Sequence, residues 1–184
     1  RAEVALGRGD ADGALLLLAE VEGLLAQAAI AQPADLNLAT MLFHSARMTV
    51  HHRCGALEEA EADGRAAERL FQTVHSYGEF RVELGDILMR RARPDEAARL
   101  WQAELDDHAG LPDTLEHAEA RLRLAWVWAS RGESARAREA ALAAAEAFGR
   151  QGQMARAKLA EQLLAALERG GTPPDFIRLS DSLL

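Results

Sequence analysis

The sequence predicts an all-α fold of paired antiparallel helices, and three observations indicate it. The 184-residue chain contains 39 alanines, the best helix-forming residue, whereas aromatic residues make up only 5%. Apolar side chains recur at helical spacing along the chain. Glycines and prolines interrupt this pattern at regular intervals, which predicts short turns between the helices. A chain of this length can bury a hydrophobic core without a metal ion or a disulfide.

The periodicity predicts helices at residues 2–8, 11–30, 34–53, 56–74, 78–92, 94–108, 112–131, 133–148 and 152–169. A glycine that can adopt a left-handed conformation follows three of them, at Gly9, Gly55 and Gly132. Prolines stand where a first helical turn begins, at Pro33, Pro94 and Pro112. Turns of about two to four residues require consecutive helices to pack antiparallel.

Composition excludes several classes of protein. The net charge of -8 argues against a general nucleic-acid binder, because such proteins need cations to replace phosphate counterions. Apolar runs such as Ala14–Ala19 are far shorter than the roughly 20 residues of a membrane-spanning helix. The single cysteine, Cys54, excludes a disulfide framework within the chain and permits a reducing compartment. We therefore expect a cytoplasmic protein with neither nucleic acid nor membrane as a direct partner.

The predicted helix pairs resemble one another. The clearest pair runs from Leu84 to Trp101, and a second similar pair runs from Leu124 to Ala144. In each pair, a small residue in the first helix allows close approach, and an alanine in the second helix lies at the crossing. The equivalent turn positions are Gly9, Gly55, Ala92 and Gly132. Successive positions are 46, 37 and 40 residues apart.

This pattern resembles the tetratricopeptide repeat over most of residues 1–169, in a lengthened form similar to bacterial signalling and regulatory proteins. The family's usual repeat has 34 residues. The resemblance implies a right-handed superhelix, or solenoid, of about four antiparallel helix pairs with a C-terminal capping helix at Met154–Glu168. Residues 170–184 are then a C-terminal tail. Because the helical pattern begins at once and no initiator methionine is present, we expect a piece of a longer bacterial protein, or a processed protein.

The resemblance also implies a concave groove that binds a protein or peptide. The groove positions carried over from the family are Thr49, His52, Arg53, Asp86, Met89, Arg90, Leu122 and Trp126. Arg53 and Arg90 could hold an acidic peptide. Trp126 lies about 200° around its helix from Trp128, so it is either an exposed anchor for a partner or a contact with the adjoining repeat. Trp101 and Trp128 match large core positions.

No catalytic motif is present: the chain lacks a glycine-rich phosphate loop with its lysine, a Gly-x-Ser-x-Gly elbow and a His-Glu-x-x-His motif. We therefore predict no enzyme activity, no cofactor and no metal site. A histidine cluster (His44, His51, His52 and Cys54) is interpreted as surface or groove histidines beside a small buried thiol, because a zinc site would need a fourth ligand from elsewhere.

Two acidic segments receive similar interpretations. Asp106-Asp107-His108 could be half of a metal or acid–base site, but we interpret it as a solvated helix end. The segment Glu58–Asp63 is interpreted as the exposed acidic start of a helix.

The leading functional hypothesis is a non-catalytic scaffold or sensor module that binds a protein or peptide. One alternative is the peptide-sensing region of a bacterial transcriptional regulator or signalling ATPase. Another is a self-association module in which the exposed end helices, residues 2–8 and 154–168, pair with a second copy.

Overall fold

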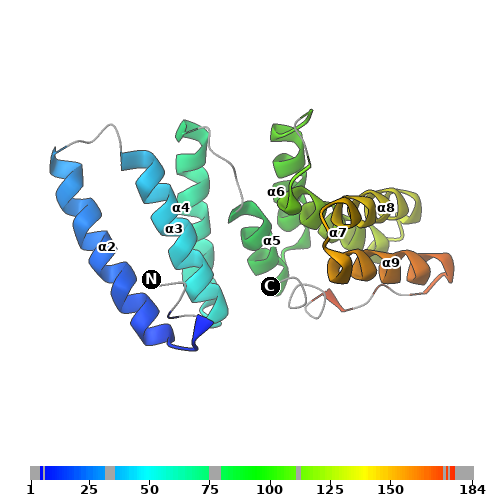
Figure 1. Cartoon of the computed structure of the whole chain (residues 1–184), viewed down its shortest axis with the longest axis horizontal. Helices are drawn as coiled ribbons and strands as arrows, with labels where there is room; N and C mark the ends of the chain where they lie inside the picture. Colours follow the sequence, from blue (N-terminus) through cyan, green and yellow to red (C-terminus); the bar gives the residue numbers. More distant parts are fainter. Residues whose placement is uncertain are drawn as a thin grey trace. The chain divides into compact units, whose positions relative to one another are not determined.

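A computed structural model of the chain describes residue 5, residues 7–31, 36–74, 80–110 and 113–171, and residues 173, 175 and 176. This part of the chain is helical and contains no strand, which confirms the all-α prediction (Figure 1). The helices are α2 (Ala11–Ala31), α3 (Leu36–Arg53), α4 (Leu57–Val74), α5 (Phe80–Arg90), α6 (Pro94–Asp107), α7 (Leu115–Ser130), α8 (Ser134–Arg150) and α9 (Met154–Glu168). The predicted helix at residues 2–8 lies largely outside the described residues. Pro33 and Pro112 lie wholly outside them.

The four turn positions that the repeat pattern equates all have positive φ angles. They are Gly9 (78°), Gly55 (77°), Ala92 (57°) and Gly132 (77°). At Gly132, the Glu133 N–H donates to the Trp128 carbonyl at 2.9 Å, so an otherwise unpaired carbonyl at the end of α7 is satisfied. The prediction that these residues end helices is therefore confirmed, as is the start of α6 at Pro94.

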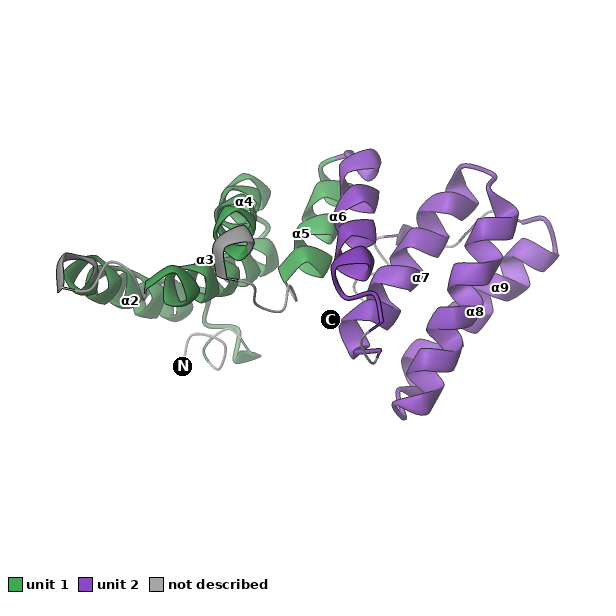
Figure 2. Ribbon diagram, turned by 90° about the horizontal axis from the view of Figure 1, so that it is seen from above, with its two compact units in different colours: residues 1–91 green, residues 92–184 purple. Residues whose placement is uncertain are grey.

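The chain divides into two compact units, unit 1 (residues 1–91) and unit 2 (residues 92–184) (Figure 2). The sequence had suggested one repeat domain over residues 1–169 followed by a tail. Within the described residues, the tail side chain Phe176 packs on tryptophans of unit 2.

In unit 1, consecutive helices pack on one another, with α3 against α4 as the most extensive pair. Helices α2, α3 and α4 run alternately up and down in Figure 1, as short connections require. Gly64 of α4 permits the close packing, because a Cβ there would lie 2.6 Å from Leu84 Cδ1 and 2.8 Å from Met48 Sδ. Small residues therefore mark the crossings, as predicted.

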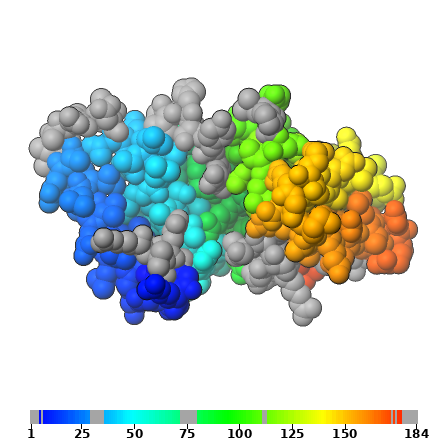
Figure 3. Space-filling view, viewed as in Figure 1, coloured from blue at the N-terminus to red at the C-terminus, as the bar shows by residue number. Residues whose placement is uncertain are grey.

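The exposed large apolar side chains described in unit 1 belong to α2 and α3, which are the blue and light-blue part of Figure 3. They are Leu16, Val21 and Leu24 of α2 and Leu38 and Leu42 of α3.

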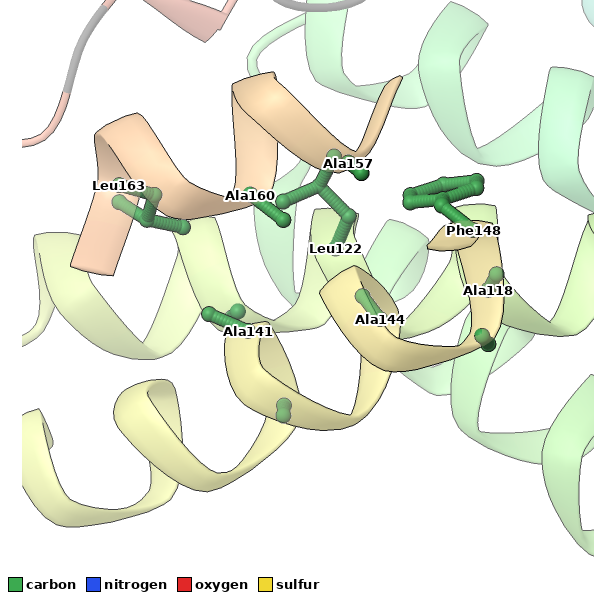
Figure 4. Close-up of a cluster of buried hydrophobic side chains, with 11 residues drawn as sticks. Ala118, Leu122, Ala141, Ala144, Phe148, Ala157, Ala160 and Leu163 are labelled. Carbon is green, nitrogen blue, oxygen red and sulfur yellow. The ribbon is translucent and has the colours of Figure 1, made fainter. Parts of the chain in front are cut away.

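In unit 2, α7 packs against α6, α8 and α9, and α8 packs against α9. Figure 4 shows alanines of α8 between larger residues of the neighbouring helices, with Leu122 from α7 and Leu163 from α9. The buried alanines Ala141 and Ala144 have no exposed surface. Their small side chains allow the helix axes to approach, so a core with few aromatic residues still packs densely.

The tryptophans only partly follow the prediction. Trp101 is fully buried, as expected for a core position. Trp128 is only partly buried, and the Arg136 guanidinium lies 4.3 Å from its ring centroid. Trp128 therefore lies at the edge of the core: it packs against the buried cluster of unit 2, and one face of its ring meets the Arg136 guanidinium of α8.

None of the helices in the described part of the chain combines the length and the apolar character needed to cross a membrane.

Candidate functional site

Most of the residues assigned to the groove lie in unit 1, and only Leu122 and Trp126 lie in unit 2. Two of the unit 1 residues converge on one carboxylate of α5. Thr49 Oγ1 donates to Glu83 Oε2 at 2.6 Å, and His52 Nδ1–H donates to Glu83 Oε1 at 2.9 Å. These hydrogen bonds join α3 to α5, so they give Thr49 and His52 a place in the packing of unit 1.

The remaining groove residues differ in exposure. Arg53 is exposed, and Met89 and Arg90 are partly buried. Asp86 is buried, and Leu122 lies within the core of unit 2 with no exposed surface. Neither of these two side chains is presented to a partner.

Trp126 forms an aromatic cluster with a side chain from the C-terminal segment. The ring of Phe176 meets the Trp126 ring edge-on with centroids 5.0 Å apart, and it lies 5.9 Å from the Trp101 centroid. Phe176 is 5% exposed. The sequence left open whether Trp126 is exposed or packed, and the structure places a tail residue on it.

A second surface of unit 2 surrounds Trp128. It is a cleft of about 290 Å³ formed by α6, α7, the turn after α7 and the start of α8. Its lining residues are Asp95, Ala98, Arg99, Gln102, Leu124, Trp128, Arg131 and Arg136. Arg131 pairs with Asp95, which neutralises part of the positive charge. The repeat pattern gave no signal for this cleft, because its arginines come from separate elements.

The histidine cluster of α3 is organised by a carboxylate from α4. Asp63 accepts hydrogen bonds from His44 Nδ1 at 2.9 Å, His51 Nδ1 at 3.1 Å and Arg47 Nη2 at 2.7 Å. Asp63 is 4% exposed, so its interpretation as part of an exposed acidic helix start was wrong. Cys54 is exposed, which corrects the prediction of a buried thiol.

The electrostatics of Asp63 favour its charged form. Burial raises the pKa of the carboxyl, but hydrogen bonds from His44 and Arg47 and the charge of Arg47 outweigh it and lower the pKa to about 2. Hydrogen bonds from three side chains occupy both carboxylate oxygens. This arrangement holds α3 and α4 together and offers no reacting group.

A third cluster lies between α6 and α7. Glu104, His108 and His117 each offer one potential ligand atom, and these atoms all lie within 4.8 Å of one another. The exposed fractions are 2%, 9% and 4%, so all three side chains are buried. His108 Nδ1–H donates to the Glu104 main-chain carbonyl at 2.9 Å, beside the Glu104 carboxylate at 3.3 Å.

This cluster corrects the interpretation of Asp106-Asp107-His108. The two aspartates are exposed as expected, but His108 turns inward and meets the His117 ring at a centroid distance of 5.1 Å. The sequence did contain part of the signal, because Glu104 and His108 are four residues apart and share a helix face. The approach of His117 depends on how α6 and α7 pack, which no spacing reveals.

The pKa of His117 is lowered, mainly because burial penalises the charged imidazolium, and further by repulsion from His108 and Arg121. Asp113, which pairs with Arg121 at 2.8 Å, opposes this shift only in part. This shift favours the neutral imidazole of His117, which keeps a nitrogen lone pair.

Comparisons of this chain with protein-family models, with curated proteins and with solved structures find no match. The tetratricopeptide resemblance therefore rests on this chain's own residues.

Proposed function

We propose that this chain is a non-catalytic helical-repeat module of the tetratricopeptide type, which binds a protein or peptide segment. In this proposal, the antiparallel helix pairs stack as a right-handed superhelix capped by α9. Support comes from the repeated left-handed turns, the alanines at helix crossings and the packing of each helix on the next within a unit. Stacked helix pairs leave a long exposed surface, for which binding is the natural use.

The observation that carries this proposal is the contact between Phe176 and Trp126. Phe176 lies beyond α9 in the chain, and its ring is buried against Trp126 and Trp101. The Trp126 surface thus accepts an aromatic side chain that helices α6 to α9 do not supply. We infer that a partner segment places an aromatic or large aliphatic residue at the same position.

Tryptophan suits this role, because interface residues that dominate binding are enriched in Trp, Tyr and Arg and lie in well-packed pockets. Trp126 offers a large rigid ring, and aromatic rings favour edge-on or offset contacts with one another. In this arrangement, the chain's own Phe176 competes with the partner, so the tail weakens binding as long as it stays in place.

The proposal is tested by panning a random peptide library against the full-length Phe176→Ala variant, in which the Trp126 surface is uncovered. We expect enrichment of peptides that contain an aromatic residue. The double variant Phe176→Ala/Trp126→Ala should lose this enrichment. The matched control Phe176→Ala/Trp128→Ala removes a tryptophan from the opposite side of the same helix and should retain it.

Two outcomes would overturn the proposal. One is that the Phe176→Ala chain enriches no peptide. The other is that the enriched peptides bind the Trp126→Ala double variant as tightly as its parent. Circular dichroism at 222 nm should show the same helix content in all three variants, so that a loss of binding is not a loss of fold.

A further inference from the structure

We propose that Glu104, His108 and His117 form a binding site for a single transition-metal ion of the zinc type in unit 2. The site is independent of the peptide-binding proposal. It combines two imidazoles and one carboxylate that the fold brings together from α6, its C-cap residue His108 and the first turn of α7. All three side chains are more than nine-tenths buried. Two histidines and one carboxylate are a ligand set that proteins use for zinc, with water or another group at the fourth position.

The separations between the three ligand atoms are close to those in a tetrahedral zinc site. Glu104 and His108 are one helical turn apart, so their side chains lie on the same side of the helix. Zinc binds nitrogen and oxygen at about 2.0–2.1 Å, so tetrahedral ligand atoms lie roughly 3.3 Å apart. Since the three ligand atoms lie within 4.8 Å of one another, the longest separation must shorten by at most about 1.5 Å. Side-chain rotations of glutamate and histidine can supply that movement.

The hydrogen bond of His108 fixes the tautomer that a metal needs. Because Nδ1–H donates to the Glu104 main-chain carbonyl at 2.9 Å, the lone pair of the neutral ring is at Nε2. An N–H to main-chain carbonyl bond of this kind is the usual support behind a metal-ligating histidine, and it orients the ring.

His117 is held at the start of α7 by its own backbone. Its N–H donates to Thr114 Oγ1 at 3.4 Å, and its ring Nδ1 accepts from the Thr114 N–H at 3.3 Å. Both bonds are long. Coordination of a metal by His117 breaks only the hydrogen bond from the Thr114 N–H to Nδ1. If Nδ1 binds the metal, its lone pair is used in that bond; if Nε2 binds the metal, the ring proton moves to Nδ1, which can then no longer accept.

The donor set also selects the class of ion. Magnesium and calcium prefer sites made of oxygen ligands, whereas imidazole nitrogen favours zinc, cobalt, nickel and copper. One carboxylate and two neutral imidazoles carry a single negative charge, which offsets half the charge of a divalent cation in a buried site.

The experiment is a cobalt titration of the tag-free, full-length protein after treatment with a chelator. Cobalt(II) in a site with few ligands absorbs visible light much more strongly, and at longer wavelength, than aqueous cobalt does, so the spectrum reports coordination directly. We expect saturation at one cobalt per chain and loss of the signal when one equivalent of zinc is added. The His117→Gln and Glu104→Gln variants should each bind cobalt at least tenfold more weakly.

The matched control is the double variant His44→Gln/His51→Gln, which removes the other histidine pair and should leave cobalt binding unchanged. Helix content by circular dichroism identifies any variant that does not fold, and Glu104→Gln serves if His117→Gln fails. The proposal is overturned if the wild-type protein shows no stoichiometric cobalt spectrum. It is also overturned if a folded His117→Gln or Glu104→Gln variant binds as tightly as the wild type, or if the control variant alone loses binding.

Discussion

The Arg47 guanidinium of α3 donates two parallel hydrogen bonds to the Asp63 carboxylate of α4, from Nε to Oδ2 at 2.9 Å and from Nη2 to Oδ1 at 2.7 Å. This two-point geometry is the strongest form of an arginine–carboxylate pair. It joins the two helices of unit 1 that pack most extensively. Breaking a buried pair by removing one partner leaves the other partner poorly compensated.

We therefore expect Asp63→Asn to lower the free energy of unfolding by about 2–3 kcal/mol. This is less than the roughly 3–5 kcal/mol of a fully buried pair, because the Arg47 side chain keeps 25% of its surface exposed. Urea unfolding at pH 7 measures the change. Glu58→Gln, an exposed acid of the same helix, is the control and should change stability by less than about 0.5 kcal/mol.

The same residue should make stability depend on acid pH. The folded-state pKa of Asp63 is lowered from 3.8 to about 2, so its stabilising contribution is complete above the unfolded pKa near 4. That contribution is lost as the pH falls from about 4 through about 2. Unfolding free energies measured across this range should fall more steeply in the wild type than in Asp63→Asn. Parallel curves would assign the acid sensitivity to other groups.

Ala92 occupies a backbone position that favours glycine. Its φ of 57° is the single positive value of a non-glycine residue in the described ranges, at a turn where the equivalent positions are glycines. The left-handed conformation costs an L-residue about 1–2 kcal/mol, and the added flexibility of glycine in the unfolded chain offsets part of the gain. Ala92→Gly should therefore stabilise the protein by about 0.5–1 kcal/mol.

Thermal unfolding with a calorimetric enthalpy measures this gain. Ala98→Gly is the matched control, because Ala98 lies inside α6, is only partly buried and has no positive φ. It should lose about 1 kcal/mol, the usual cost of glycine within a helix. Destabilisation by both substitutions would contradict strain at Ala92.

The tryptophans Trp101 and Trp128 should differ in their cost of truncation. Trp101 is fully buried, so Trp101→Ala leaves a cavity and is expected to cost about 3–5 kcal/mol. Trp128 lines an open cleft beneath Arg136, so Trp128→Ala should cost clearly less, about 1–2 kcal/mol, from lost apolar burial and the cation–π contact. Chemical denaturation compares the two, and equal losses would show that Trp128 is as much a core residue as Trp101.

Phe176→Ala should uncover Trp126 and shift tryptophan emission to longer wavelength, because the indole gains contact with water. The loss of a nearly buried phenylalanine should cost about 2 kcal/mol in unfolding free energy. In the Trp126→Ala background the emission shift should shrink, since the responding ring is gone. An unchanged spectrum in Phe176→Ala would mean that the tail does not cover Trp126 in solution.

The fold class could be predicted because it depends on local preferences. The alanine-rich helical periodicity predicted the boundaries of the described helices to within a few residues. Gly9, Gly55 and Gly132 end helical segments because left-handed turns favour glycine. Even Ala92 was placed at an equivalent turn by spacing alone. The interpretation of a shared face for His44 and His51 also follows from the helical period.

The candidate sites could be predicted only in part. Whether Asp63 is exposed, whether Cys54 is buried and whether His108 faces solvent depend on which neighbour covers each residue. His117 lies nine positions beyond His108, and only the packing of α7 against α6 brings the two rings together. Phe176 gave no periodic signal at all, because it lies outside the helices that carry the pattern.

By itself, the sequence determined the helices, their turns and the small residues at their crossings, because backbone conformation and helical period are properties of neighbouring residues. Only the tertiary structure decided that Asp63 gathers Arg47 and two histidines, that Phe176 covers Trp126, and that Glu104, His108 and His117 meet. Each of these contacts joins different helices or segments, and its geometry is fixed by how those elements dock.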